Sequence, residues 1–215
     1  MESIASIIQD IAILSAPVLI AITFHEVAHG WVADKLGDPT ARLLGRLSLN
    51  PIKHLDPIGT LAFVLTKMVG WAKPVPVNPF NFKDPAKGMM WVAIAGPVTN
   101  LFLAAISAVI LRLLLASGIL FDPSLSFIMK PIYMMVQVSV IINVGLAVFN
   151  FIPIPPLDGS KILMGLLSRE QVEIYARIEP YGFLILLLLI MTNIVHMILS
   201  PIIGFAVSLL VGGGF

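Results

Sequence analysis

Residues 11–31 read IAILSAPVLIAITFHEVAHGW, an apolar run interrupted near its end by two histidines and a glutamate. A run of about 20 apolar residues is long enough to cross the hydrocarbon core of a bilayer as one α-helix. We therefore predict a helix that enters the membrane near Ile11 and reaches the opposite face near Trp31, an aromatic residue of the interfacial kind. Ionisable side chains are costly inside a membrane, so the three in this run are candidates for function.

The composition of the whole chain also indicates a membrane protein. Of its 215 residues, 58% are hydrophobic and 12% are charged, whereas a soluble domain is roughly 45–50% apolar and about 25% charged. The mean hydropathy of +0.99 agrees with this assignment. A formal net charge of +1 gives no reason to expect nucleic acid as a partner, and the lipid bilayer is the expected environment. We expect residues 1–215 to form a single membrane-embedded domain.

Three further apolar runs are long enough to span a membrane, which predicts about four spans in total. They cover residues 89–115, 131–152 and 181–199. The second of these runs ends at Pro153, Pro155 and Pro156, because proline lacks an N–H donor and disfavours helical geometry in the preceding residue. Pro201 interrupts the pattern after the last span, so residues 202–211 are predicted to form either a return half-span or a surface helix.

The segments between the spans are predicted to lie at the membrane surface. Alternating apolar and polar residues at 41–49 predict a short strand, and residues 75–77 predict a second, which together give a small membrane-surface β-sheet. Residues 57–71 are apolar but too short to span comfortably, so they indicate a re-entrant or interfacial helix. The predicted fold class is an all-α polytopic membrane protein with about four transmembrane helices, this additional helix and the small sheet.

Lysine and arginine are concentrated on one predicted side of the membrane. Residues 34–88 contain eight and residues 158–180 contain three, whereas residues 112–130 contain two. The positive-inside rule places the side with eleven in the cytoplasm and the N-terminus outside. We therefore expect a multi-pass protein of the cell (inner) membrane, with the histidines near the end of the first span on the cytoplasmic side.

The motif His25-Glu26-Val-Ala-His29 has the spacing of a zinc site. On a helix, positions i and i+4 lie one turn apart on the same face, so two imidazoles can bind one Zn²⁺. Glu26 can then act as a base toward a water molecule at the metal. The alternative is a polar helix end whose histidines are satisfied by hydrogen bonds.

A catalytic zinc ion commonly has three protein ligands, so the two histidines leave one ligand to be found. Because the chain has no cysteine, the third ligand must be His, Asp or Glu. Asp158 is the best candidate, since it follows an apolar span at the right depth and precedes Gly159, which allows close approach of the backbone. Its alternative role is the N-cap of a helix over residues 160–168.

Three motifs together resemble the site-2 protease family of intramembrane zinc metalloproteases, peptidase family M50. They occur in the order of that family and anchor roughly residues 18–160. They are His25-Glu26-x-x-His29 near the end of an early span, Gly96-Pro-Val-Thr-Asn100, and Asn150-Phe-Ile-Pro-Ile-Pro-Pro-Leu-Asp158-Gly159 after a later span. The chain has no room for a PDZ or CBS domain and resembles the compact members.

The resemblance implies that His25, His29 and Asp158 bind one zinc ion per chain and that Glu26 is the general base. It also implies that Asn150 contacts the substrate or the developing oxyanion. An amide in an apolar span can donate to a peptide carbonyl, although hydrogen bonding between helices is the alternative role.

Other polar residues near these motifs are assigned more weakly. His54 resembles a pattern in the short members, which implies a contact with substrate or oxyanion, and its alternative is to stabilise the surface loop or face solvent. For Asn100 and Asn143 we favour a structural role over a catalytic one. His196, in the last predicted span, is not expected to bind metal.

The function implied by the resemblance is regulated intramembrane proteolysis: hydrolysis of peptide bonds within or next to the transmembrane segments of membrane-protein substrates. Single-span membrane proteins are the expected partners. A divalent-metal transporter would share the apolar composition and the buried ligands, but no chain of further acidic or histidine residues continues across the spans. An inactive membrane scaffold would retain the fold, but the intact ligand set with Glu26 argues against it.

Overall fold

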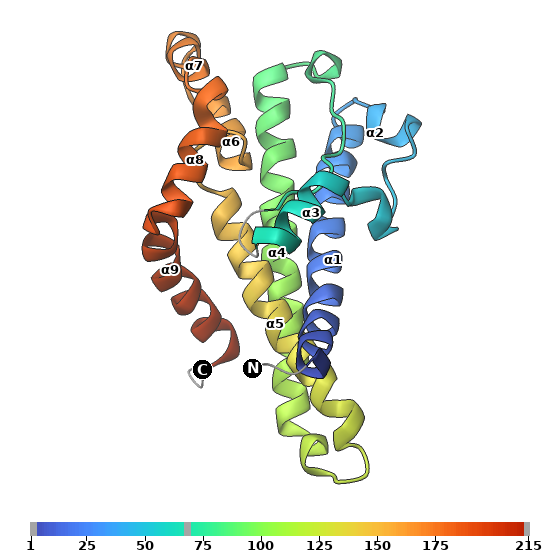
Figure 1. Cartoon of the computed structure of the whole chain (residues 1–215). Helices are drawn as coiled ribbons and strands as arrows, with labels where there is room; N and C mark the ends of the chain where they lie inside the picture. Colours follow the sequence, from blue (N-terminus) through green and yellow to red (C-terminus); the bar gives the residue numbers. More distant parts are fainter. Residues whose placement is uncertain (1–3, 67–69, 213–215) are drawn as a thin grey trace.

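The computed structural model describes residues 4–66 and 70–212, and every regular element in them is a helix (Figure 1). The long helices are α1 (Ile4–Lys35), α4 (Pro85–Ala116), α5 (Ser126–Asn150) and α9 (Ile194–Val211). The short α-helices are α2 (Thr40–Leu43), α3 (Pro57–Thr66), α6 (Asp158–Leu166), α7 (Arg169–Ala176) and α8 (Gly182–Met191). Single 3₁₀ turns are η1 (Pro51–His54), η2 (Pro79–Asn81), η3 (Ile119–Phe121) and η4 (Glu179–Tyr181).

Helix α4 is the central element, packed against α1, α5 and α6. Its buried face repeats every four residues. The members of this face include Gly88, Val92, Gly96, Asn100, Ala104 and Ala108. Most of them are small, so the neighbouring helix backbones can approach closely, as is usual between membrane helices. Toward the C-terminal end of α4, Ala104 and Ala108 pack with Val140 and Val144 of α5 and with Val207 of α9 in the main apolar core.

Five helical stretches in the described residues are long and apolar enough to cross a membrane. They are Ile11–Lys35, Pro85–Ala116, Ser126–Asn150, Arg169–Met191 and Ile194–Val211. Large apolar side chains remain exposed on these stretches, including Phe102 (66%), Leu113 (65%) and Leu188 (61%). An apolar surface of this extent is suited to lipid rather than water. The architecture is that of a multi-pass membrane protein.

The fifth candidate span corrects the prediction of about four. The predicted span 181–199 divides into α8 and the first turns of α9, and α9 continues through Pro201 to Val211. The helix breaks at Asn193, whose φ of 61° lies in the left-handed region that asparagine adopts more readily than most residues. Proline is tolerated within membrane helices. Residues 202–211 therefore continue the helix that begins at Ile194, and the whole helix is long and apolar enough to be a candidate span.

The predicted β-sheet is wrong for the described residues. At 41–49, the chain begins within α2 and then turns tightly, with the Arg46 N–H donating to Ala41 O at 2.8 Å and the Ser48 N–H donating to Arg46 O at 3.0 Å. Residues 75–77 do not pair either, because Pro74 and Pro76 lack the N–H groups that a ladder requires. In the described part of the chain, the β-contact is one isolated bridge between Leu55 and Ala72.

The predicted re-entrant or interfacial helix is present as α3. It covers Pro57–Thr66 of the predicted range 57–71 and is not among the candidate spans. Residues 67–69 of that prediction lie outside the described residues. The isolated bridge described above joins the segments that precede and follow α3, so both ends of the predicted helical segment lie close together.

A buried carboxylate links the start of the connection between α1 and α4 to its end. The Asp38 side chain is fully buried and accepts hydrogen bonds from the Thr40 hydroxyl, from the Asn78 N–H at 2.7 Å and from the Asn81 amide at 2.6 Å. Burial acts to raise the pKa of Asp38, but these hydrogen bonds, led by that of Thr40, hold it below its ordinary value. The carboxylate is therefore ionised at neutral pH and fixes the end of α1 to the turn that precedes α4.

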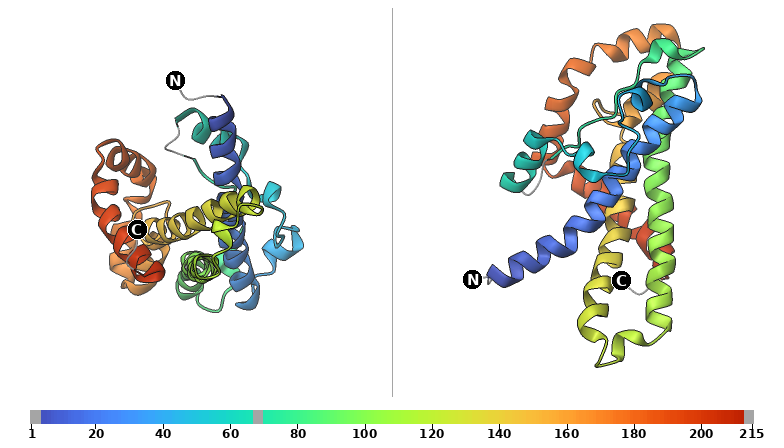
Figure 2. Two further views of the ribbon diagram at one scale, coloured as in Figure 1. Left: turned by 90° about the horizontal axis from the view of Figure 1, so that it is seen from below. Right: turned by 90° about the vertical axis from the view of Figure 1, so that its right-hand side faces the viewer.

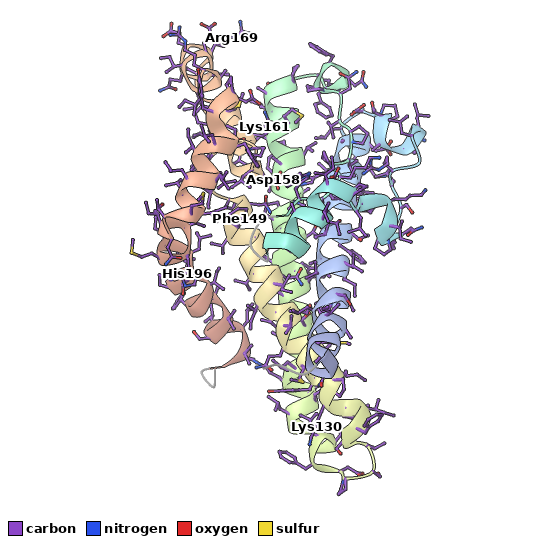
Figure 3. The ribbon with its side chains drawn as sticks, in the orientation of Figure 1. Lys130, Phe149, Asp158, Lys161, Arg169 and His196 are labelled. Atoms are coloured by element: carbon purple, nitrogen blue, oxygen red, sulfur yellow. The ribbon has the colours of Figure 1, made fainter. Side chains whose placement is uncertain are left out.

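The surface segments gather at one end of the bundle. Figure 1 shows α2, the start of α4, α6 and α7 at this end and the η3 turn at the other. Asp158 lies in the half of the molecule that carries Arg169, whereas Lys130 lies near the opposite end (Figure 3). Figure 2 shows α8 and α9 on one side of α5, with α1 on the other. The lysine-rich and arginine-rich segments 34–88 and 158–180 therefore share the end toward which Asp158 lies.

Candidate metal centre

The two histidines of α1 face each other within one helical turn. The ring centroids of His25 and His29 are 4.6 Å apart, and their Nε2 atoms are 3.0 Å apart. Both side chains are buried, with residue exposures of 8% and 9%. The i, i+4 spacing therefore brings the two nitrogens together as predicted from the sequence.

Asp158 reaches the same point from a distant part of the chain. Its Oδ2 lies 3.2 Å from His25 Nε2 and 3.4 Å from His29 Nε2. One donor atom from each of the three side chains lies within 4.8 Å of the others, so the set can hold one metal ion. The alternative role of Asp158 as an N-cap is not found, since Leu157 occupies that position and Asp158 is the first residue of α6.

Tight packing of the preceding loop presents Asp158 at this position. The prolines after α5 end that helix, and the chain returns on itself before α6 begins. A Cβ atom at Gly159 would lie 2.4 Å from the carbonyl oxygens of Phe151 and Ile152. Only glycine allows this close approach, so the residue that follows Asp158 is part of the geometry that presents it.

Hydrogen bonds on the far side of each ring determine which nitrogen faces Asp158. His29 Nδ1 lies 2.7 Å from the carbonyl oxygen of Val92, which can only accept a hydrogen bond. His25 Nδ1 lies 2.6 Å from Asn100 Oδ1, while the Asn100 amide donates to Ala21 O at 3.2 Å and to Asn143 Oδ1 at 2.9 Å. Both Nδ1 atoms are therefore donors. In the neutral form of each ring, the Nε2 lone pair is then directed toward Asp158, the arrangement typical of metal-binding histidines.

The residues fit a cation. Two Nε2 lone pairs and a carboxylate oxygen converge, and Asp158 Oδ2 is buried with no hydrogen-bond partner in the described residues. Burial acts to raise the pKa of Asp158, but the two neighbouring imidazoles, when they are protonated and no metal is bound, lower it to about 2, so the carboxylate is ionised at neutral pH. Buried acceptors without a donor are costly unless a positive charge joins them. Two histidines and one carboxylate form a ligand set known for catalytic zinc.

Gly96 keeps the space between α1 and α4 open for these rings. A Cβ atom at this position would lie 2.5 Å from His29 Nε2 and 2.6 Å from His25 Cε1. Val92 and Asn100, which hold the two Nδ1 atoms, lie one turn before and one turn after Gly96 on the same face of α4. The sequence motif from Gly96 to Asn100 thus forms the wall of the site opposite α1.

Glu26 is held by the backbone of a distant segment. Its Oε2 accepts the N–H of Val75 at 2.9 Å, and its Oε1 has no hydrogen bond from the described residues. Val75 is buried, and a Cβ atom at Gly30 would lie 2.8 Å from its side chain, so the segment packs directly on α1. One carboxylate oxygen is fixed, and the other remains available to accept a proton.

The structure places Asn150 at the end of α5, where its amide donates to Leu146 O of the same helix at 3.0 Å. This hydrogen bond matches neither predicted role, because it joins neither a second helix nor a group of the metal site. The contact of Asn150 with substrate or oxyanion therefore stays a prediction.

His54 lies within the surface loop and is fully buried. Its Nε2 is 2.7 Å from Ser48 O, and its carbonyl oxygen accepts the Lys73 N–H at 2.9 Å. These bonds agree with the loop-stabilising alternative. Nδ1 of the ring has no hydrogen-bond partner in the described residues, and the predicted contact with substrate remains untested.

Two functional contacts were not predicted from the sequence. Asn100 was assigned a structural role, but its Oδ1 also orients His25. The spacing of one turn between Gly96 and Asn100 is a signal that could have placed the amide beside the histidine pair. The contact between Glu26 and the Val75 N–H had no such signal, because it involves the backbone of a segment 49 residues away.

Comparison with known proteins agrees with this geometry. The sequence model of peptidase family M50 matches residues 124–193. The chain is 40% identical over 186 residues to "Putative zinc metalloprotease YwhC" of Bacillus subtilis (strain 168), covering 86% of this chain and 83% of the relative. The chain belongs to peptidase family M50. This M50 protein is a zinc metalloprotease, and the site formed by His25, His29 and Asp158 suits its metal.

Other relatives are longer than this chain. It is 28% identical over 179 residues to Rip2 of Mycolicibacterium smegmatis, which carries the same description as YwhC, covering 81% of this chain and 64% of the relative. It is 27% identical over 201 residues to "Zinc metalloprotease MJ0392" of Methanocaldococcus jannaschii, covering 90% of this chain and 48% of the relative. No solved structure matches the chain.

Proposed function

We propose that this M50 protease hydrolyses peptide bonds within or next to the transmembrane segments of single-span membrane proteins, the chemistry of regulated intramembrane proteolysis. The observation that supports this most strongly is the convergence of His25, His29 and Asp158 between membrane-spanning helices. A hydrolytic site embedded in an apolar bundle is suited to substrates that are themselves in the bilayer. The alternative function of such a site is to pass metal ions across the membrane.

In the proposed mechanism, His25 and His29 would hold Zn²⁺ through Nε2, and Asp158 would hold it through a carboxylate oxygen. When bound, zinc lowers the pKa of a water molecule toward about 7 and polarises the scissile carbonyl. Glu26 Oε1 accepts a proton from the attacking water as its oxygen bonds to the carbonyl carbon. Glu26 then gives that proton to the amide nitrogen as the C–N bond breaks. The Val75 N–H holds Oε2 and so keeps Oε1 in place for both transfers.

The substrate must reach this site as an extended chain. A helical transmembrane segment hides its peptide groups in hydrogen bonds between residues i and i−4, so cleavage requires local unwinding. Asn150 is the proposed donor to the substrate carbonyl, in exchange for its present bond to Leu146 O. His54, whose Nδ1 has no partner in the described residues, is the weaker candidate for a second contact.

We further propose that the end carrying the site faces the cytoplasm and that the N-terminus lies outside, in the cell (inner) membrane. Eleven of the thirteen lysine and arginine residues lie in segments 34–88 and 158–180. The positive-inside rule assigns such an end to the cytoplasm. Cleavage would then release a cytoplasmic fragment of the substrate.

The polar network beyond the site argues against ion transport. From Asn100, hydrogen bonds continue to Asn143 at 2.9 Å and on to Ser139, whose hydroxyl lies 2.9 Å from that of Ser107. These amides and hydroxyls are occupied by one another, and none of them is ionisable. In the described part of the chain, no second group of three or more acidic or histidine side chains lies close enough together to hold a metal ion.

The experiment that tests the proposal compares the wild-type protein with Glu26→Gln in detergent. Zinc per chain is measured by elemental analysis, and cleavage is measured on a model single-span membrane protein. We expect one zinc in each protein and cleavage by the wild type alone. Glu173→Gln, which neutralises an exposed carboxylate of α7, is the matched control and should retain cleavage. Cleavage by Glu26→Gln would remove Glu26 as the base, and zinc uptake into vesicles without cleavage would favour a transporter.

A further inference from the structure

Residues 169–191, which we call the α7–α8 arm, lie at the outside of the bundle. The arm comprises α7, η4 and α8, and α8 packs chiefly against η4 and α9 rather than against α1, α4 or α5. Much of its apolar surface is exposed, including Leu184 (64%) and Leu188 (61%). The position of the arm therefore depends on a small number of specific contacts.

The arm makes two polar contacts, one with a residue before Asp158 in the sequence and one with a residue after it. The Tyr175 hydroxyl donates to the carbonyl oxygen of Pro153 at 2.7 Å, five residues before the proposed metal ligand. The Glu179 carboxylate accepts from Lys161 Nζ at 2.7 Å, three residues after it. Figure 3 shows Lys161 on α6 beside Asp158, on the side of the arm. The two bonds therefore hold the segment that carries Asp158 from both ends.

A third contact lies between these two. At Gly182, the first residue of α8, a Cβ atom would lie 2.3 Å from the carbonyl oxygen of Pro155 and 2.6 Å from its Cβ. The start of α8 is thus pressed directly against the loop that ends at Asp158. An edge-to-face contact between Phe183 and Trp71, with ring centroids 6.4 Å apart, adds a link from the arm to the segment after α3.

We infer that Tyr175 and Glu179 are positioning residues for Asp158, so that docking of the α7–α8 arm and binding of the metal are linked. The inference rests on the proposed role of Asp158 as a zinc ligand. An arm that is docked holds the 153–161 segment in the position where Oδ2 reaches the two imidazoles. By linkage, zinc at that position must in turn favour the docked arm by the same factor.

The first test measures the zinc dissociation constant of the purified protein. Tyr175→Phe removes the hydroxyl that donates to Pro153 O, and Glu179→Gln removes the negative charge that holds Lys161 Nζ, while both leave His25, His29 and Asp158 unchanged. We expect each to raise the constant by about three- to tenfold, as for the loss of one hydrogen bond or one charge pair that supports the bound geometry. Tyr133→Phe and Glu173→Gln make the same chemical changes away from these contacts, and should bind zinc like the wild type.

The second test measures the arm itself and needs no substitution in the network. Because the chain has no cysteine, spin labels can be attached specifically to Leu184→Cys on α8 and Phe102→Cys on α4, both at exposed positions. We expect the distance distribution to shift to longer values and broaden when the zinc is removed by a chelator. Tyr175→Phe in the labelled protein should show part of this shift with zinc bound.

The two tests must agree, because the linkage is reciprocal. Wild-type zinc affinity in both Tyr175→Phe and Glu179→Gln, or a distance distribution unchanged by chelation, would overturn the inference. A wild-type protein that binds no zinc at this site would overturn the proposed function and the inference with it. Zinc bound by the wild type, and equally by the variants, would overturn the inference alone.

Discussion

Replacing Asn100 by leucine should weaken zinc binding although none of the three proposed ligands is replaced. Asn100 is fully buried, and its Oδ1 is the acceptor for His25 Nδ1 at 2.6 Å. Leucine has a similar volume but no acceptor, so the imidazole loses the bond that fixes its tautomer and ring orientation. Partners of this kind typically change metal affinity by about 10- to 100-fold when removed, which corresponds to about 1.4–2.8 kcal/mol.

The assay is a competition titration of the detergent-solubilised protein with a zinc chelator. Asn143→Leu is the matched comparison, because it removes an amide from the same buried network but leaves the bond between Asn100 and His25 in place. We expect both variants to lose thermal stability and Asn100→Leu to lose substantially more zinc affinity. Equal zinc affinity in the two variants, or wild-type affinity in Asn100→Leu, would refute the argument that Asn100 orients the ligand.

Two further predictions concern Gly96 and Val75 beside the site, and a third concerns the buried carboxylate of Asp38. Gly96→Ala places a methyl group 2.5 Å from an imidazole nitrogen and should lower zinc per chain, whereas Gly204→Ala, with nothing within 4 Å, should not; equal zinc contents would contradict this. Val75→Pro removes the N–H donor to Glu26 and should lower kcat by about 10- to 100-fold with zinc retained, since hydrogen bonds to charged groups contribute about 1.5–3 kcal/mol. An unchanged kcat would exclude a positioning role for Val75. The pKa of Asp38 is depressed in the folded state, because hydrogen bonds outweigh burial, so its contribution to stability is present above the unfolded pKa of about 3.9 and is lost as pH falls through the lower folded value. Thermal unfolding between pH 3 and 7 should therefore be less pH-dependent in Asp38→Asn, and an identical pH dependence would show that this carboxylate is not responsible.

The convergence of His25, His29 and Asp158 could be predicted from the sequence because local rules determine most of its geometry. The period of the helix places His25 and His29 on one face, and the absence of cysteine restricts the third ligand to His, Asp or Glu. Asp158 then follows from its position after an apolar span. The membrane character of the chain could also be predicted from the sequence. The thickness of the bilayer sets the length of a span, and its apolar core requires apolar residues.

The features that were predicted wrongly depend on tertiary contacts. Alternating polarity at 41–49 suggested a strand, but Ala41 packs within α2 close to Gly30, and the prolines at 74 and 76 remove the donors of the expected partner. The helix breaks at Asn193, where the backbone adopts a positive φ, and not at Pro201. Proline is tolerated inside a membrane helix. These outcomes depend on proline positions, backbone conformation and packing, which the alternation of polar and apolar residues does not show.

The most direct test of the zinc site is X-ray absorption spectroscopy at the zinc edge of the wild-type protein. We predict one zinc per chain with two imidazole ligands at about 2.0–2.1 Å and carboxylate oxygen at about 2.0–2.2 Å. Substitution of His25 by alanine should remove one of the two imidazole signals or abolish binding. A zinc environment with no imidazole scattering, or one unchanged in His25→Ala, would contradict the convergence of α1 and Asp158 on a single metal ion.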